Sequence, residues 1–366
     1  MGFSCGIVGL PNVGKSTIFN ALSKAQNAES ANYPFCTIDP NRGVVPVPDE
    51  RMNFIIQYIK PKSIVPTTVE FVDIAGLVKG ASHGEGRGNQ FLTHIRQTDA
   101  IAHVVRCFEN DEIVHVENKV DPANDIEIIN TELLLADMEI LDKAVTKHQK
   151  AAKSGDKALK KKVEVLEAFL KCADEGKPLR ALLKDNPEYI DEIREYNFIT
   201  IKPMLYVANV DEDALAEDNE HVKKVRQIAA AEGAEVVKIC GKTECELQDL
   251  SEEEAKEYLM SLGMERSGLD SLIKSGYDLL GLITFFTAGE KEVRAWTVEN
   301  GATAPQAAGK IHSDIERGFI RAEVCSYADF EKYKSLTTAK ENGRLRLEGK
   351  DYIVQDGDIM YFRFNV

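Results

Sequence analysis

The residues most able to do chemistry lie near the start of the chain, in the run Gly9-Leu10-Pro11-Asn12-Val13-Gly14-Lys15-Ser16. This run is a complete GxxxxGK[ST] phosphate-binding loop, and it follows an apolar stretch, residues 3–8, that we expect to form a buried strand. Its glycines let backbone N–H groups surround phosphate oxygens, and its lysine can reach the β- and γ-phosphates. The loop predicts binding of a nucleoside triphosphate by Asn12, Val13, Gly14, Lys15, Ser16 and Thr17.

A second motif supplies candidate ligands for Mg²⁺. Residues 68–76 form an apolar strand that ends in DxxG, with Asp73 placed to hold a metal-bound water and the amide of Gly76 placed to contact the γ-phosphate. Thr37, in a polar, proline-marked loop before an expected strand at 43–47, is the candidate second hydroxyl. The sequence therefore predicts a Mg²⁺ site made by Ser16, Thr37 and Asp73. The glycine-rich run 80–88 is interpreted as a switch that orders on the γ-phosphate.

The residues that read the base depart from the guanine pattern. An apolar strand at 203–209 ends in Asn209-Val210-Asp211-Glu212, where guanine-specific proteins carry NKxD. In that pattern a short carboxylate accepts two hydrogen bonds from guanine, and adenine has no donors at those two positions. Valine at the lysine position and a longer glutamate at the end weaken selection for guanine. We predict that ATP is preferred, that GTP binds more weakly, and that Asn209, Val210 and Glu212 contact the nucleotide.

Composition restricts the classes of protein that the chain can belong to. Its 366 residues carry a formal net charge of −15, so any nucleic-acid contact must come from a local basic patch. No apolar run approaches the length that spans a membrane, and we expect a cytoplasmic monomer without a membrane partner. The seven cysteines are scattered, as is typical of reduced thiols. Cys240 and Cys245 lack the second pair of ligands that a zinc site needs, so we interpret them as packed thiols.

Two further parts of the chain have their own patterns. Between Thr131 and Cys172 apolar residues recur at helical spacing, interrupted at Ser154-Gly155-Asp156, which predicts two antiparallel helices. The segment Lys143–Lys162 contains eight lysines and one aspartate, which is consistent either with a solvated hairpin or with a clamp on the phosphate backbone of ribosomal RNA. After residue 281 the pattern changes to a mixed α+β unit, with one helix expected at 304–317 and strands at 291–298 and 359–364.

These patterns predict an α/β fold in which a helical hairpin interrupts a P-loop nucleotidase domain. We assign residues 1–130 and 196–280 to the nucleotidase domain, 131–195 to the hairpin and 281–366 to a C-terminal α+β domain. No evident catalytic constellation lies in that last part. We therefore interpret it as a binding module for RNA or a ribosomal protein.

At this point the resemblance to one family is specific. The runs GLPNVGKST, FCTIDPN, EFVDIAGLVKGAS, GNQFL and NVDE, followed by KEVRAWT, GATAPQAAGKIH and EGKDYIVQDGD, resemble the YchF subfamily of Obg-related P-loop proteins, the Obg-like ATPases. The resemblance covers nearly the whole chain. It implies an Obg-type G domain, a C-terminal TGS domain of β-grasp type, use of ATP, and association with ribosomes.

The residue that orients the attacking water is the least determined part of the site. In Ras-like proteins a glutamine follows DxxG, but here that position is Leu77, which forms no hydrogen bond through its side chain. Intrinsic hydrolysis should therefore be slow. The resemblance implies that His115 is catalytic, and His83 in the glycine-rich run is the competing candidate. Lys15 of the phosphate-binding loop is the second predicted catalytic residue.

The motifs together favour a Mg²⁺-dependent ATPase that acts as a regulatory switch on ribosomes or RNA. Two alternatives remain at this stage: a translational GTPase with relaxed base specificity, and a nucleotide-controlled RNA-binding protein with negligible hydrolysis. A small-molecule kinase is disfavoured because no arginine-rich lid stands out.

Overall fold

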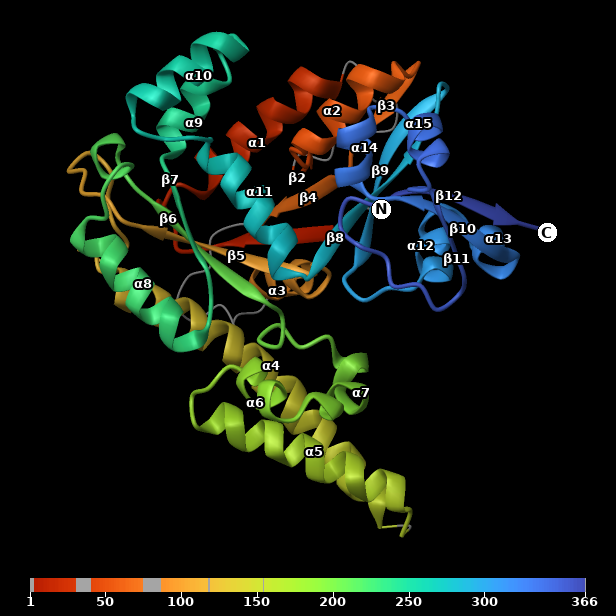
Figure 1. Ribbon diagram of the computed structural model, residues 1–366. Helices are drawn as coiled ribbons and strands as arrows, with labels where there is room; N and C mark the ends of the chain where they lie inside the picture. Colours follow the sequence, from red (N-terminus) through yellow and green to blue (C-terminus); the bar gives the residue numbers. More distant parts are fainter. Residues whose placement is uncertain (1–2, 31–40, 75–86, 118, 154, 366) are drawn as a thin grey trace.

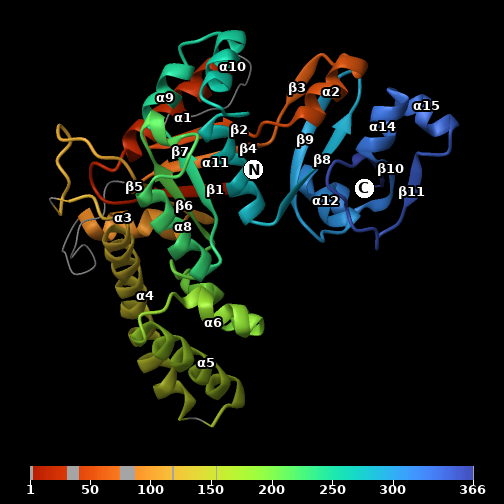
Figure 2. The ribbon, with the colours of Figure 1, turned by 60° about the vertical axis from the view of Figure 1, so that its left-hand side comes forward.

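The computed structural model describes residues 3–30, 41–74, 87–117, 119–153 and 155–365. In these ranges the chain forms two six-stranded sheets and a pair of long helices that project away from the first sheet (Figures 1 and 2). Of the predicted site residues, Thr37, Gly76 and His83 lie outside the described residues, as does Leu77.

The first sheet consists mainly of parallel strands in the order β2-β4-β1-β5-β6-β7. Their bounds are β1 (Phe3–Val8), β2 (Arg42–Pro46), β4 (Thr68–Asp73), β5 (Ala100–Arg106), β6 (Met204–Asn209) and β7 (Val236–Ile239). β2 runs antiparallel to β4, and the other described pairings in this sheet are parallel. β5 and β6 are buried at every position, as expected of central strands that are covered on both faces. Ligands of such sheets bind at the carboxyl ends of the strands.

Helices cover both faces of the first sheet (Figure 1). On one face α1 (Lys15–Ser30) contacts α9 (Gly241–Leu247), and α11 (Gly268–Leu279) packs on β7 and β6. On the other face α4 (Pro122–Ala152) contacts α8 (Glu220–Glu232). The described part of this region also contains α3 (Arg87–Arg96) and α10 (Glu252–Ser261). The core between these layers is mostly aliphatic, with Ile7, Val105 and Leu205 fully buried, and includes a few aromatic rings such as Phe71.

The projecting pair consists of α4 and α5 (Lys157–Asp174), which share a core of their own that includes Leu141, Leu166 and Phe169. The chain returns to β6 through α6 (Leu179–Asp185), α7 (Ile190–Ile193) and the short 3₁₀ turns Pro187–Tyr189 and Arg194–Tyr196. α4 begins at Pro122, because a proline's fixed φ and missing N–H suit the first turn of a helix. This long helix therefore runs across the boundary predicted between residues 130 and 131, and the division into 1–130, 131–195 and 196–280 stays a prediction.

The second sheet has the order β11-β10-β12-β8-β9-β3. Its C-terminal strands are β8 (Leu282–Ala288), β9 (Glu292–Glu299), β10 (Phe319–Cys325), β11 (Arg346–Glu348) and β12 (Ile359–Phe364). The helix predicted at 304–317 is two helices, α12 (Ala304–Ile311) and α13 (Ser313–Arg317), because His312 between them is extended, with φ −164° and ψ 141°. α14 (Tyr327–Tyr333) and α15 (Leu336–Glu341) follow β10.

The second sheet also takes residues from the amino-terminal half of the chain. β3 (Ser63–Val65) pairs in parallel with β9, and α2 (Glu50–Ile59) buries Met52 and Ile55 against Phe286 and Phe330. Figure 2 shows α2 and β3 beside the C-terminal strands, away from the first sheet. The predicted C-terminal unit, residues 281–366, is therefore completed by a segment that the sequence analysis placed in the nucleotidase domain.

The observed layers confirm the predicted class: an α/β nucleotidase part, an inserted pair of helices and a C-terminal α+β part. The TGS and β-grasp labels remain predictions. In the described residues no helix combines the length and the apolar character that crossing a membrane requires.

Candidate nucleotide-binding site

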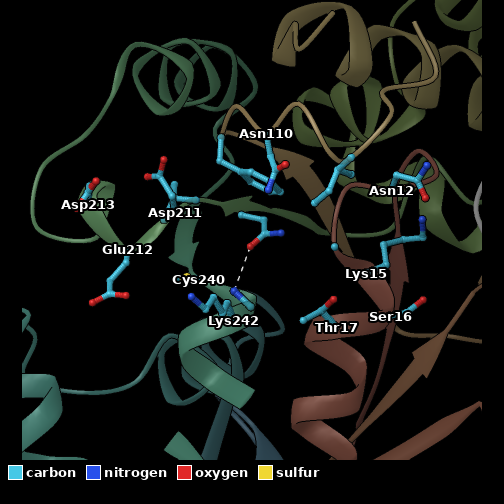
Figure 3. A pocket seen from close by; sticks show the side chains of 16 residues that line it. Asn12, Lys15, Ser16, Thr17, Asn110, Asp211, Glu212, Asp213, Cys240 and Lys242 are labelled. Carbon is cyan, nitrogen blue, oxygen red and sulfur yellow. Dashed lines mark hydrogen bonds between the residues drawn. The ribbon is translucent and has the colours of Figure 1, made fainter. Parts of the chain in front are cut away.

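A pocket of about 730 Å³ opens at the carboxyl ends of the central strands of the first sheet. It is lined by Asn12, Gly14, Lys15, Ser16, Thr17, Phe108, Asn110, Ile113, Asn209, Val210, Asp211, Glu212, Asp213, Cys240, Gly241 and Lys242. Figure 3 shows Lys15, Ser16 and Thr17 at one end of the pocket and Glu212 with Asp213 at the other. The structure thus brings the predicted phosphate loop and the predicted base-reading residues to one cavity.

The phosphate loop has the backbone that its glycines allow. Gly9, Asn12 and Gly14 have φ angles of 154°, 62° and 99°, which most side chains disfavour. A Cβ atom at Gly14 would lie 2.0 Å from Nδ2 of Asn209, so glycine is required there by contact as well as by conformation. The amide of Ile18 donates to the carbonyl of Gly14 at 3.0 Å and starts α1. The amino end of this helix faces the pocket and favours an anion.

Lys15 and Asp73 form the charged centre of the phosphate end. Lys15 is buried, and its Nζ donates to the carbonyl of Leu10 at 2.7 Å. Burial lowers the pKa of Lys15 to about 8, and the nearby charge of Asp73 opposes this shift. Burial also raises the pKa of Asp73, against the effect of Lys15. Oδ1 of Asp73 is buried and has no hydrogen-bond partner among the described residues, so this carboxylate is available to a ligand.

Asn209 joins the two ends of the pocket. Its Nδ2 donates to the carbonyl of Val13 at 2.9 Å, and its Oδ1 accepts from the amide of Gly241 at 3.1 Å. This side chain therefore ties the phosphate loop to the start of α9. Cys240, Gly241 and Lys242, at the start of α9, also line the pocket.

The base end is formed by the turn after β6. Val210 is buried and its amide donates to the carbonyl of Ile239 at 2.8 Å. Asp211 caps the 3₁₀ turn η4 (Glu212–Ala214) by accepting from the amide of Ala214. Glu212 is exposed on that turn. Val210 carries no ammonium stem that could cover a purine, so the base-reading role of this turn stays a prediction.

One wall of the pocket was not found by the sequence analysis. Phe108, Asn110 and Ile113 belong to the loop after β5 and line the pocket across from Cys240 and Lys242; Figure 3 labels Asn110 on this wall. The position of this loop in the sequence could have predicted it. β5 is a central parallel strand, so the loop at its carboxyl end lies beside the phosphate loop.

His115 lies in the same loop but is not among the residues that line the pocket. It is buried, its Nε2 lies 3.0 Å from Oδ2 of Asp125, and its Nδ1 accepts from the amide of Glu117 at 3.2 Å. Nε2 therefore carries the proton and donates to Asp125. The preceding carbonyl, that of Val114, accepts from Nδ2 of Asn12 at 3.1 Å, which places the histidine next to the phosphate loop. Its catalytic role stays a prediction.

Cys240 and Cys245 are free thiols, as are the other described cysteines. Cys245 Sγ lies 3.7 Å from the carbonyl oxygen of Thr17, so this thiol contacts the start of α1. No group of three or more His, Cys, Asp or Glu side chains that could hold a metal occurs in the part of the chain that the structure describes.

A parallel sheet whose first strand leads into a glycine-bounded phosphate loop, with an aspartate ending the adjacent strand, defines a P-loop nucleotidase. Residues 4–140 match the family model described as "50S ribosome-binding GTPase", and residues 282–365 match the YchF-GTPase C-terminal model, described as "Protein of unknown function (DUF933)".

The full chain has relatives at high identity. It is 58% identical to the protein named ribosome-binding ATPase YchF of Haemophilus ducreyi and 54% identical to that of Bacillus subtilis, each over 100% of both chains. The solved structure of the Schizosaccharomyces pombe YchF GTPase is 38% identical and superposes with a TM-score of 0.88, covering 99% of this chain and 98% of that one. The chain belongs to the YchF family.

Proposed function

We propose that the chain is an ATP-binding, slowly ATP-hydrolysing switch that acts on the ribosome in the cytoplasm. The observation that carries the proposal is the pocket that joins Lys15 and the phosphate loop to the Val210–Glu212 turn. The names of the bacterial relatives, ribosome-binding ATPases at up to 58% identity over the full chain, support the same activity.

The phosphate end fits Mg²⁺. The unpartnered oxygen of Asp73 and the exposed hydroxyl of Ser16 are oxygen donors, which Mg²⁺ prefers, and Thr37 is the proposed third contributor. When bound, Mg²⁺ would offset the negative charge of the β- and γ-phosphates. Lys15 would share that task, because its ammonium is held in the pocket and would exchange the carbonyl of Leu10 for phosphate oxygens.

Hydrolysis requires a group that orients water, and the proposal assigns this role to His115. In the structure, Nε2 of His115 donates a hydrogen bond to Asp125, so the ring must turn or its loop must shift before Nε2 can contact water at the γ-phosphate. Substitution His115→Ala should lower kcat at least tenfold and leave ATP affinity within twofold, as general acid–base groups contribute about 10²–10⁴ in rate. Unchanged turnover in His115→Ala would exclude His115 and leave His83 as the candidate that orients water. The turnover of His83→Ala then tests that candidate.

The nucleotide preference has a direct test. The purified chain is titrated with labelled ATP in excess Mg²⁺, and unlabelled ATP and GTP compete for it. We expect ATP to displace the label at lower concentration than GTP, and Lys15→Ala to abolish binding of both. Equal or stronger displacement by GTP would favour the second candidate, a GTPase with relaxed base specificity, which the name of the solved Schizosaccharomyces pombe relative supports.

Ribosome contact is proposed to use the lysine-rich tip of the helical pair together with the 281–366 region. Seven of the eight lysines between 143 and 162 are exposed. Ion pairs join Lys143 to Glu139 and Lys161 to Glu192, and Lys162 pairs with Glu195. The other exposed lysines, which have no ion pair within the described residues, are free to contact RNA phosphates.

Replacing Lys147, Lys150, Lys153 and Lys157 by Gln should reduce co-sedimentation with ribosomes. It should also flatten the dependence of log affinity on log salt by about one per lost phosphate contact. The control replaces two exposed lysines elsewhere, Lys223 and Lys274, by Gln. Equal co-sedimentation of both variants would exclude the helical tip as the contact.

A further inference from the structure

The loop that forms the unpredicted wall of the pocket is held by one buried arginine. Arg106 is the last residue of β5, and its charged side chain is only 1% exposed. Its guanidinium also lies over the ring of Phe108, 4.7 Å from the centroid. A buried guanidinium stays charged and must find hydrogen-bond acceptors in the protein.

The acceptors are three backbone carbonyl oxygens of the following loop. Nε donates to Phe108 at 3.1 Å, Nη1 to Ile113 at 2.9 Å, and Nη2 to Asn110 at 3.0 Å. These three residues are the ones through which this loop lines the nucleotide pocket. Because the guanidinium is planar and rigid, its three hydrogen bonds hold the three wall residues at fixed positions relative to one another.

The rest of this loop is held mainly at its two ends. Residues 107–116 contain no helix or strand, and Val114 and Val116 are 71% and 45% exposed, so apolar burial does not anchor the loop. The amide of Cys107 donates to the carbonyl of Asn209 at 2.8 Å, and Asn12 donates to the carbonyl of Val114. The first contact holds the start of the loop and the second joins it to the phosphate loop. Asn219 also donates to the carbonyl of Cys107 at 2.7 Å, and His115 is buried against Asp125. Among the described side chains, Arg106 is the one that binds the carbonyls of all three wall residues.

We infer that Arg106 is a positioning residue that holds the Phe108–Ile113 wall in its nucleotide-binding arrangement. The inference rests on the proposed function, because the wall matters for activity only if the pocket binds a nucleotide. Arg106 itself contacts backbone carbonyls and has no place among the residues that line the pocket. We therefore expect substitution of Arg106 to weaken the binding of nucleotides regardless of how many phosphate groups they carry.

The first test needs no nucleotide. Hydrogen–deuterium exchange is measured on the nucleotide-free full chain for peptides that cover residues 107–117, in wild type, Arg106→Gln, Arg106→Lys and the control Arg317→Gln. Arg317 is an exposed arginine of α13 that pairs with Asp314. We expect at least tenfold faster exchange in Arg106→Gln and an intermediate rate in Arg106→Lys, whose single ammonium cannot span three carbonyls. Exchange at the wild-type rate in both variants would overturn the inference.

The second test measures dissociation constants for ATP and ADP, well below the melting temperature of each variant. Loss of one well-placed buried hydrogen-bond donor corresponds to about tenfold in an equilibrium constant. We expect about tenfold weaker binding of both nucleotides to Arg106→Gln, by the same factor, with partial recovery in Arg106→Lys and none of this loss in Arg317→Gln.

The two tests separate the possible failures. Wild-type affinity in Arg106→Gln together with faster loop exchange, or with a lower melting temperature only, would make Arg106 a purely structural residue and overturn its role in the site. If the wild-type chain binds no purine nucleotide, the proposed function fails, and the exchange experiment still decides whether Arg106 orders the loop. If Arg106→Gln does not fold, Arg106→Lys carries both measurements.

Discussion

At the scale of single residues, the site places a cation and an anion in an environment that disfavours both charges. Burial lowers the pKa of Lys15 to about 8 and raises the pKa of Asp73. In the unfolded chain Lys15 keeps its ordinary pKa of 10.5. Between these two pH values the unfolded state binds more protons than the folded state, so the stability of the nucleotide-free protein rises with pH. Nucleotide binding has the opposite dependence, because it requires the ammonium.

The affinity for ATP should therefore be nearly constant just above neutral pH and should fall as the pH rises through about 8, by up to tenfold per unit, as Lys15 loses its proton in the free protein. Isothermal titration calorimetry with Mg²⁺ and ATP measures this. Adenosine, which carries no phosphate, is the control and should show no such decrease. An ATP affinity that does not change up to about pH 9.5 would contradict a weakened Lys15 ammonium.

The base end allows a second prediction at this scale. The double substitution Val210→Lys with Glu212→Asp restores the guanine-reading pattern on the turn after β6. A bidentate pair discriminates between bases by about 1–3 kcal/mol, so we expect the ratio of ATP to GTP affinity to fall by about tenfold or more. The competition assay measures the ratio. A ratio equal to that of the wild type would show that base choice is made elsewhere in the pocket.

At the scale of elements, a buried carboxylate links the long helix α4 to two other segments of the nucleotidase core. Asp137 is fully buried and accepts from Arg96 at 2.9 Å, at the end of α3. It also accepts from the amides of Ile199 and Thr200, at 2.9 and 2.7 Å, where the chain returns from the helical pair. Burial raises the pKa of Asp137, and the charge of Arg96 opposes that shift. One side chain thus joins α3, α4 and the segment that leads into β6.

Substitution Asp137→Ala should lower the free energy of unfolding by about 3–5 kcal/mol, because it leaves the Arg96 charge and two backbone amides without their partner. Urea denaturation followed by circular dichroism measures the loss. Asp142, an exposed acidic residue of the same helix, is the control, and Asp142→Ala should change stability by less than about 0.5 kcal/mol. Equal effects of the two substitutions would mean that the buried network does not hold the helix.

At the scale of the whole molecule, the C-terminal sheet and the nucleotidase sheet share one segment of chain. α2 and β3 complete the C-terminal unit, while the strands on either side of them, β2 and β4, belong to the first sheet. Arg51 of α2 pairs with Asp356 at 2.7 Å and lies over the ring of Phe286. β4 ends at Asp73, in the candidate metal site. A displacement of the C-terminal unit would therefore act on strands that border the phosphate end of the pocket.

The fragment 281–366 alone should be poorly folded, because it lacks the side chains of Met52 and Ile55 that fill one face of its sheet. Loss of one buried aliphatic side chain costs about 2–5 kcal/mol, which is a large part of the stability of a small domain. Adding residues 48–67 through a flexible linker should raise the melting temperature, as measured by circular dichroism. The matched control carries Met52→Ser and Ile55→Ser in the added segment. Identical melting of the bare and the extended fragments would contradict the shared core.

The sequence by itself determined which residues form the phosphate loop. Gly14, Lys15 and Ser16 are consecutive residues of one loop, so their spacing is sufficient to predict it. Asp73 and Asn209 lie at the ends of strands with clear apolar patterns. The helical pair was recognisable because its core residues recur along α4 and α5. Features that depend on residues close together in the sequence could therefore be predicted from it.

Only the tertiary structure decided which distant segments meet. β3 is three residues long and largely exposed, so it has no periodic pattern, and its pairing depends on β9 far along the chain. The wall residues Phe108, Asn110 and Ile113 bind Arg106 through their backbone carbonyl groups. Every residue type has such a carbonyl, so the sequence does not show which ones accept these hydrogen bonds. The orientation of His115 toward Asp125 is likewise a result of packing between a loop and a helix, which short motifs do not encode.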